Sequence, residues 1–385
     1  MILIISLLLV SQVSAKTNNS RWDSADILIE GSLGSYAEFA ADYNYSNGNI
    51  YVVCVPDSGF YFHPDSLGLL FFRSTDHGET WDMIGRDAYE TEGWTAKGID
   101  LVVTRSDTAY IVFSWYYTDL EHDGLQVGRV YDSGGDWNIE WISPLIDATE
   151  IRSPKLVRDD FNDFYLYLAY LDVTPENDSL IILRSEDRGY NWSNLLRATS
   201  AAEWQDHDIA ISDSSIYHLS TFQHFENQTL QLTYWRNRGS PVGVKNLQEI
   251  NTNEDGQIQY PRIGATTTLP YSGQLVYAFY SQENPGGGND LLYQYSQNGG
   301  IDWSSTSDTL VKESSSPVLC DLRGYQVAPN QWMDITYCFT SPDPSFENFW
   351  SWSVEGDPAN WQETSSVGMG PNKSIPELIY SPGAP

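Results

Sequence analysis

Short runs of apolar and aromatic residues, separated by turn-forming residues, recur along the whole chain. In one representative stretch these runs cover residues 153–157, 163–171, 179–187 and 192–198. Runs of this length that are bounded by Gly, Pro, Asn and Asp are typical of β-strands joined by short turns. The pattern therefore predicts an all-β chain with repeated sheets of four antiparallel strands.

A motif that ends in tryptophan sets the length of the repeat. Three copies, ending at Trp81, Trp192 and Trp303, are spaced 111 residues apart, and a fourth, ending at Trp137, lies halfway between the first two. The period is therefore about 55 residues, which is the length of one supersecondary unit in repeat architectures. The copies consist of Ser74, Asp76, Gly78 and Trp81; Asp132, Gly134 and Trp137; Ser185, Asp187, Gly189 and Trp192; and Ser296, Asn298, Gly300 and Trp303.

This motif is expected to stabilise a turn and not to carry chemistry. An Asp side chain accepts backbone N–H groups within a tight turn, Gly adopts a positive φ, and Trp packs beneath the turn between neighbouring sheets. The motif resembles the Asp-box, or bacterial neuraminidase repeat, of the sialidase-like β-propellers. The resemblance implies an all-β β-propeller of four-stranded blades, with every Asp-box on the same face.

The phase of the repeat predicts six complete blades, a lone strand at 22–30 and a partial blade at the end of the chain. Seven blades are favoured, because a propeller closes when the two ends of the chain complete one blade and leave no unpaired edge. On that count the natural chain continues past Pro385. A six-bladed ring with spare end strands is the alternative. The predicted domain covers residues 16–385, with blades at 38–91, 97–148, 153–201, 207–252, 260–312 and 317–366 and the partial blade at 375–385.

Residues 1–15 are predicted to be a secretory signal peptide. An apolar run at residues 2–10 precedes the small residues Ser14 and Ala15, and it is too short to span a bilayer. We therefore expect a secreted or cell-surface protein that does not insert into the membrane, and we expect it to be a monomer.

The net charge of the chain disfavours polyanionic partners. The chain has 52 acidic and 20 basic residues, a formal net charge of −32, and this repulsion disfavours nucleic acid and anionic membrane surfaces. No cofactor is expected. The acidity is typical of an extracellular protein, and calcium binding by clustered carboxylates is the alternative.

Three cysteines, Cys54, Cys320 and Cys338, cannot form a complete disulfide framework, because an odd count leaves one of them unpaired. Cys320 and Cys338 fall on two adjacent predicted strands. A disulfide between them and a pair of free thiols are both open.

The face opposite the Asp-boxes is predicted to carry the function. The crossovers between blades and the loops after the second strands converge there, as in other scaffolds whose loops bind ligands. Aromatic rings and carboxylates gather in these segments, and they suit the faces and hydroxyls of sugars. The candidate ligand-binding residues are Trp94, Trp204, Asp206, His207, Asp208, Tyr260 and Arg262. No metal site is predicted, because no second His stands at a ligand spacing from His207.

The catalytic pattern implied by the resemblance does not transfer to this chain. Catalytic sialidases bind a carboxylate with three arginines, the first of which lies in an Arg-Ile-Pro motif that opens the first blade. Here residues 35–40 read Ser-Tyr-Ala-Glu-Phe-Ala, with no arginine. If the protein is an enzyme, the candidate catalytic residues are Arg152, Arg262, Arg323, Asp208 and Tyr325.

The sequence therefore favours a propeller that binds a glycan or a surface protein on its loop-rich face without catalysis. The alternative is a glycan-active enzyme, either an exo-sialidase-like hydrolase or a polysaccharide lyase.

Overall fold

A computed structural model of the chain consists of antiparallel β-sheets, with no helix among the residues that it describes. The prediction of an all-β fold with four-stranded sheets is confirmed, because the described residues form five four-stranded sheets and a sixth in which a fifth strand is added to four. The structure describes residues 2–5, 36–44, 46–56, 66–76, 78, 80–90, 94–117, 122–159, 162–200, 203–212, 215–224, 227–236, 243–251, 256–266, 275–305, 307–327, 330–340, 346–354, 357–363, 368–370 and 377–380.

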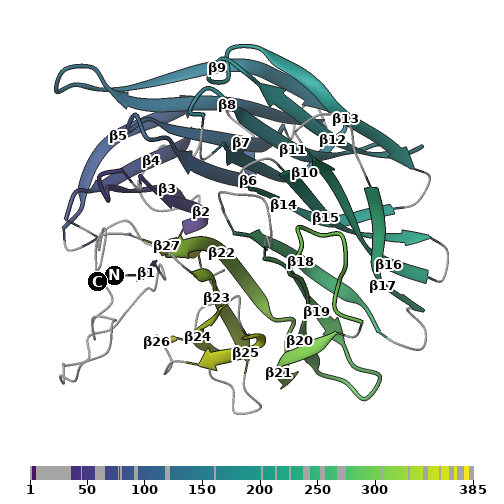
Figure 1. Cartoon of the computed structure of the whole chain (residues 1–385). Coiled ribbons are helices and arrows are strands. Elements are labelled where there is room, and N and C mark those ends of the chain that lie inside the picture. The colour runs from purple at the N-terminus through teal and green to yellow at the C-terminus, as the bar shows by residue number, and fades with distance from the viewer. Residues whose placement is uncertain are drawn as a thin grey trace. The chain divides into compact units, whose positions relative to one another are not determined.

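The chain divides into two compact units. Unit 1 comprises residues 1–199 and 379–385, and unit 2 comprises residues 200–378. Each unit contains three sheets in which successive strands pair in sequence order (Figure 1). None of the described segments forms a helix that could cross a membrane.

The three sheets of unit 1 use strands that are consecutive in the chain. They are formed by β2 (Tyr36–Tyr43), β3 (Ile50–Pro56), β4 (Ser66–Ser74) and β5 (Asp82–Glu90); by β6 (Trp94–Val103), β7 (Ala109–Tyr117), β8 (His122–Asp132) and β9 (Trp137–Ala148); and by β10 (Glu150–Arg158), β11 (Leu166–Val173), β12 (Asp178–Ser185) and β13 (Trp192–Ser200).

Unit 2 repeats this order, with one extra strand in its last sheet, where β26 pairs with β24. Its sheets are formed by β14 (Glu203–Ile211), β15 (Ser215–His224), β16 (Asn227–Arg236) and β17 (Gly243–Asn251); by β18 (Ile258–Ala265), β19 (Val276–Glu283), β20 (Asn289–Ser296) and β21 (Asp308–Ser314); and by β22 (Leu319–Val327), β23 (Asn330–Thr340), β24 (Phe346–Val354), β25 (Asp357–Glu363) and β26 (Gly368–Gly370).

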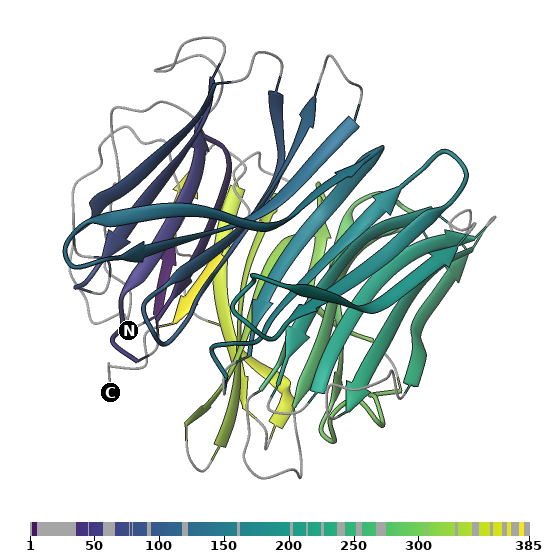
Figure 2. The same ribbon diagram turned by 90° about the horizontal axis from the view of Figure 1, so that it is seen from above.

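The first strands of successive sheets are neighbours within each unit. In unit 1, β6 lies beside β2 and β10, and in unit 2, β18 lies beside β14 and β22. Figure 2 shows the strands of each sheet side by side from above. Sheets that meet along their first strands in this way are typical of blades, and the N-terminal ends of these strands lie at the blade entrances that the sequence nominated for binding.

Apolar side chains fill the space between adjacent sheets. Phe71 and Phe113 belong to the cluster between the first two sheets of unit 1, and Leu219 and Val276 belong to the cluster between the first two sheets of unit 2. The motif tryptophans Trp137, Trp192 and Trp303 pack against these inter-sheet clusters. Because a strand in a middle sheet has apolar neighbours on both faces, its sequence is nearly continuous in apolar residues, as in β7, whose residues belong to the clusters on both sides.

The two ends of the chain meet in a two-stranded sheet. β27 (Glu377–Tyr380) pairs with β1 (Ile2–Ile5), which lies inside the predicted signal peptide. The sequence predicts that residues 26–30 pair with the sheet that contains residues 378–380, or lie next to it, and this stays a prediction. The apolar run at the start of the chain has high β propensity and supplies hydrogen bonds to an edge strand. Residues 22–30 lie outside the described residues, and the number of blades stays a prediction.

Cys320 is a buried free thiol, so the pairing with Cys338 that the sequence left open is absent. The register explains this, since Cys320 lies opposite Tyr337 while Cys338 lies opposite Leu319. In this register the two cysteines are not paired with each other across the strands. Cys54 is also buried.

Candidate functional site

A buried ion pair lies between the first strands of two adjacent sheets in unit 2. Arg262, on β18, has its Nη1 atom 3.5 Å from Oδ2 of Asp206, on β14, and the two side chains are 11% and 21% exposed. The same Nη1 atom donates a hydrogen bond to the carbonyl oxygen of Pro261 at 2.8 Å. The guanidinium group is therefore held by its own chain and by one carboxylate of the neighbouring sheet.

Further carboxylates act on this arginine. Burial alone would lower the pKa of Arg262, but Asp206 and Asp208, with smaller contributions from Cys320 and Asp321, raise it above its ordinary value. The thiol of Cys320 shows the opposite balance, because burial raises its pKa to about 12 although Arg262 opposes the shift. The group thus combines one permanent positive charge with three carboxylates on β14 and β22.

Asp208 also has a structural contact. Its Oδ2 atom accepts the backbone N–H of Ile263, on the next sheet, at 2.9 Å. The sequence nominated Asp208 for binding or catalysis, and in the structure Asp208 also joins two neighbouring sheets. Such a link satisfies a first-strand N–H that has no partner in its own sheet.

β-Bulges shape the entrances of the first strands. In β18 the register shifts between Gln259 and Arg262, and in β10 it shifts between Arg152 and Lys155. Within these bulges Tyr260 and Ser153, each followed by proline, adopt positive φ values of 51° and 48°. A bulge redirects side chains, and a non-glycine residue at positive φ is strained, a combination that is common beside binding sites. β2, β6 and β14 carry similar shifts, whereas β22 pairs with β23 without one.

Arg152, another of the three arginines that the enzyme alternative would use to bind a carboxylate, is also in an ion pair. Arg152, in unit 1, donates from Nε to Oε1 of Glu150 at 2.7 Å, and both side chains are half-exposed. The third arginine, Arg323, lies on β22, but its side chain and that of Tyr325 are outside the described residues. The catalytic roles of Arg152, Arg262 and Arg323 stay a prediction of the enzyme alternative.

Two of the nominated aromatic residues are buried. Trp204 is 6% exposed and packs on Phe222, with the ring centroids 5.5 Å apart, and His207 is fully buried. The His207 ring lies 5.3 Å from that of His218, and burial, with the neighbouring His207, keeps the pKa of His218 well below its ordinary value. Both side chains are thus buried in this structure, and their contact with a ligand stays a prediction. Tyr260 is half-buried, and the side chain of Trp94 is outside the described residues.

The tryptophan-ended motifs form the turns between the third and fourth strands. In the first, Oγ of Ser74 accepts the N–H of Gly78 at 2.7 Å, and Asp76 accepts the N–H and hydroxyl of Thr80 at 2.8 and 2.6 Å. These hydrogen bonds from Thr80 lower the pKa of Asp76 to about 2. The turns that hold Asp187 and Asn298 repeat the geometry with the N–H groups of Asn191 and Asp302.

Several carboxylates that the sequence did not single out link neighbouring sheets. Asp42 on β2 accepts the N–H of Val103 on β6 at 2.8 Å, and Asp100 on β6 accepts the N–H of Leu156 on β10 at 2.7 Å. The signal available in the sequence was the placement of an Asp within an otherwise apolar first strand. A buried Asp in such a strand needs a partner, so it predicts a link to a neighbouring sheet.

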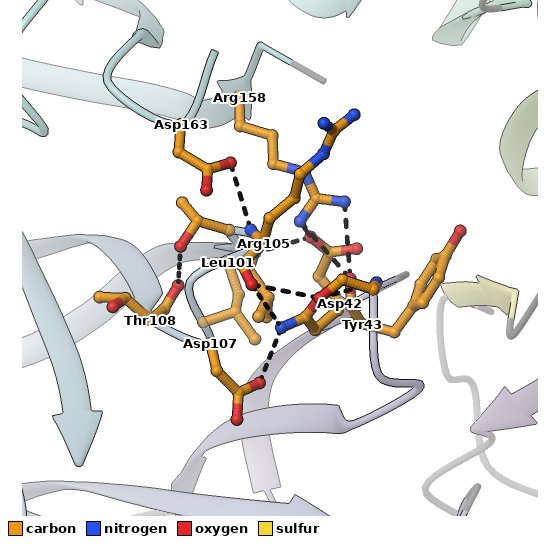
Figure 3. Close-up of polar contacts among 12 residues, drawn as sticks. Asp42, Tyr43, Leu101, Arg105, Asp107, Thr108, Arg158 and Asp163 are labelled. Atoms are coloured by element: carbon orange, nitrogen blue, oxygen red, sulfur yellow. Dashed lines mark hydrogen bonds and ion pairs between the residues drawn. The ribbon is translucent and has the colours of Figure 1, made fainter. Parts of the chain in front are cut away.

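Asp42 also anchors a buried arginine across unit 1 (Figure 3). Nη1 of Arg158, on β10, lies 3.0 Å from Oδ2 of Asp42 and 3.4 Å from the carbonyl oxygen of Tyr43. The same carboxylate oxygen accepts the N–H of Val103, so the ends of β2, β6 and β10 meet at one atom. The nearby turn is stabilised by Asp107, whose carboxylate receives Asn44 at 2.9 Å and Arg73 at 2.7 Å.

The described residues contain no group of three His, Cys, Asp or Glu side chains arranged to hold a metal ion. Asp206, Asp208 and Asp321 are engaged with Arg262. Calcium binding stays an expectation from composition alone.

No family model and no curated protein match this sequence. Solved structures do resemble it. An ulvan lyase from a new family of polysaccharide lyases superposes with a TM-score of 0.56 at 11% identity, over 84% of this chain and 82% of the lyase. An α-L-arabinofuranosidase of Fusarium graminearum, in complex with an iminosugar inhibitor, gives a TM-score of 0.52 at 14% identity, over 82% of this chain and 92% of that enzyme.

The NanB sialidase of Streptococcus pneumoniae is a third neighbour. Its complex with optactamide superposes with a TM-score of 0.52 at 10% identity, over 81% of this chain, which spans 66% of the NanB chain, slightly less than two thirds. At these identities the likeness concerns the fold and not the activity. Together with the six antiparallel sheets of four or five strands, it shows that this chain has an all-β, β-propeller fold.

Proposed function

We propose that the protein binds a glycan at the entrances of its first strands, without transforming it. The observation that carries this proposal is the polar group of Asp206, Asp208 and Arg262 next to the strained Tyr260 on β18. Carboxylates accept hydrogen bonds from sugar hydroxyls, and an aromatic ring offers an apolar face on which a sugar ring can stack. The structural neighbours, all glycan-active proteins by their descriptions, support this type of ligand.

Pairing of the arginines argues for binding over sialidase-type catalysis. A carboxylate grip requires guanidinium groups that are free to make charge-assisted, two-point contacts with the substrate. Arg262 and Arg152 each engage a carboxylate of their own unit, at 3.5 and 2.7 Å. A hydrolase or lyase acting on glycans is the second candidate, and it is supported by the enzymes among the structural neighbours.

The test combines binding and activity. Purified protein would be titrated with soluble galactan, arabinan, β-glucan and ulvan, while reducing ends and the absorbance of unsaturated uronates are followed in the same samples. We expect saturable binding of at least one polysaccharide and no product. A Tyr260→Ala variant should bind that polysaccharide about tenfold more weakly, as loss of a well-packed aromatic anchor does.

Tyr190→Ala is the matched control, because Tyr190 is an exposed tyrosine in an Asp-box turn of unit 1. It should leave the affinity unchanged. Product formation would replace binding with the enzyme candidate, and equal losses in both variants, or no binding by the wild type, would contradict the proposed site.

A further inference from the structure

The ion pair between Arg262 and Asp206 resembles an occupied anion site. Among the side chains of β14, β18 and β22 that the structure describes, Arg262 is the only arginine, and it is nearly buried. A ligand carboxylate could reach its Nη1 atom only by taking the place of the Asp206 carboxylate. Asp206 is the more exposed partner, at 21% against 11%, so it lies on the solvent side of the pair.

Asp206 is held in this position from both ends. Its Oδ1 atom accepts the backbone N–H of His207 at 2.8 Å, which leaves Oδ2 for Arg262. The bulge between Trp204 and Asp206 sets the direction of the side chain, and Thr221 donates its hydroxyl to the Asp206 carbonyl oxygen at 3.4 Å. A carboxylate fixed in this way is pre-organised, so its removal from Arg262 by a ligand would cost the pair and the backbone contact together.

The surrounding charge disfavours a second anion. Asp208 and Asp321 act on the same guanidinium group, so three carboxylates face one positive charge. An acidic sugar that approached this group would meet a net negative field, within a chain whose formal net charge is −32. An uncharged sugar meets no such barrier, and its hydroxyls can donate to the carboxylates.

We propose that Asp206 is a specificity-determining residue that occupies the anion position of Arg262, so that the site accepts uncharged sugars and rejects carboxylated ones. This inference rests on the proposed function, since it concerns the same site. It separates this chain in ligand class from the ulvan lyase neighbour, which has been described in complex with an oligosaccharide that contains GlcA and Rha3S. Specificity then comes from an internal competitor for the arginine as well as from contacts with the ligand.

The test uses pairs of probes that differ only in charge. Soluble β-1,4-galactan and mixed-linkage β-glucan would each be compared with a form whose primary hydroxyl carbons have been oxidised to carboxylates. We expect the wild type to bind at least one neutral form about tenfold more tightly than its oxidised partner, the ratio that corresponds to one charge-assisted hydrogen bond gained or lost. The binding preference of the wild type does not depend on the folding of any variant.

Asp206→Asn should lower the ratio of the affinity for the neutral form to the affinity for the oxidised form by about tenfold, because the amide releases Arg262 to a ligand carboxylate. The two forms would then bind about equally, or the oxidised form more tightly. Asp206→Glu keeps the charge and should retain the wild-type preference. Glu140→Gln is the charge-matched control, because it removes one carboxylate from another arginine pair, with Arg129 at 2.6 Å in unit 1. It should leave the ratio unchanged.

Three outcomes would overturn the inference. The wild type could bind an oxidised form as tightly as its neutral partner, Asp206→Asn could weaken binding of both forms equally, as a purely structural ion pair requires, or Glu140→Gln could shift the ratio as much as Asp206→Asn. Failure of the wild type to bind any polysaccharide is distinct from these, because it overturns the proposed function and this inference with it.

Discussion

The turns between third and fourth strands and the first strands both use carboxylates to hold backbone N–H groups, but over different distances along the chain. Asp76 accepts the N–H of Thr80 and Asp187 that of Asn191, four residues away in each case. In the first strands, Asp42 and Asp208 hold N–H groups that are 61 and 55 residues away, in the neighbouring sheet. The first type of contact stabilises a turn, and the second joins one sheet to the next.

This difference shows why a carboxylate in a first strand is hard to interpret by itself. Asp206, Asp208 and Asp42 all lie in first strands, yet their contacts differ. Asp206 pairs with an arginine, Asp208 accepts a backbone N–H group of the next sheet, and Asp42 does both. We therefore expect the loss of a link between sheets to lower the free energy of unfolding more than the loss of a turn contact, since water cannot replace a hydrogen bond between buried strands.

The largest effect is expected at Asp42. Asp42→Asn would leave Arg158, whose side chain is 4% exposed, as a buried charge without its carboxylate. The free energy of unfolding should fall by about 3–5 kcal/mol, as for other broken buried ion pairs. Urea or thermal unfolding would measure the loss. The double variant Asp42→Asn with Arg158→Met should recover part of it, and a single variant as stable as the wild type would show that this link is not important.

Asp208→Ala should have the next largest effect. It removes the acceptor of the Ile263 N–H, and an unsatisfied, partly buried N–H costs about 1–3 kcal/mol. Asp208→Asn keeps an acceptor oxygen and should lose less, which a comparison of midpoints in urea would show. Equal losses in the two variants would mean that charge, and not the link between sheets, accounts for the stability.

His218 should make the protein less stable in mild acid. Its pKa is lowered in the folded state by burial and by His207, so below about pH 6.5 the unfolded chain takes up a proton that the folded chain does not. The free energy of unfolding should then fall by up to about 1.4 kcal/mol per pH unit on acidification from this group. Unfolding midpoints at pH 7.5, 6.5 and 5.5 would show it.

The histidine comparison needs two variants. His218→Leu should remove this part of the pH dependence, whereas His122→Gln, at a half-exposed position in β8, should retain it. An unchanged pH profile in His218→Leu would contradict the assignment.

A turn carboxylate should matter less than either link between sheets. Asp76→Ala loses two hydrogen bonds to Thr80 in an exposed turn, where water replaces part of what is lost, and the cost should be about 1 kcal/mol. Asp76→Asn should be milder, because Asn298 at the matching position of another turn accepts the N–H of Asp302 at 2.9 Å. Calorimetry would compare the two, and a loss from Asp76→Ala larger than that from Asp208→Ala would reverse the ranking.

Tyr260 should give the smallest effect, and one of opposite sign. Tyr260→Gly relieves a positive φ of 51° at a residue that has a Cβ atom, which should raise the free energy of unfolding by about 0.5–1 kcal/mol. Thermal unfolding would measure this gain, while glycan affinity falls as for Tyr260→Ala. A loss of stability would show that ring packing, and not backbone strain, dominates at this position.

The sequence by itself determined the features that depend on near neighbours in the chain. The spacing of Trp81, Trp137, Trp192 and Trp303 predicted repeated four-stranded sheets, because each unit has the same order of strands and turns. A turn such as that of Asp76 is satisfied within a few residues, so its hydrogen bonds follow from its own sequence.

Only the tertiary structure decided what the first strands do. Trp204 and His207 look like surface residues in a crossover, yet both are buried, Trp204 against Phe222 and His207 beside His218 on the next strand of the same sheet. The roles of Asp42, Asp206 and Asp208 depend on partners about one repeat or more away in sequence, and a bulge in β14 or β18 changes the direction of the side chains. Local sequence specifies neither the partner nor the bulge, since both arise only when neighbouring sheets pack together.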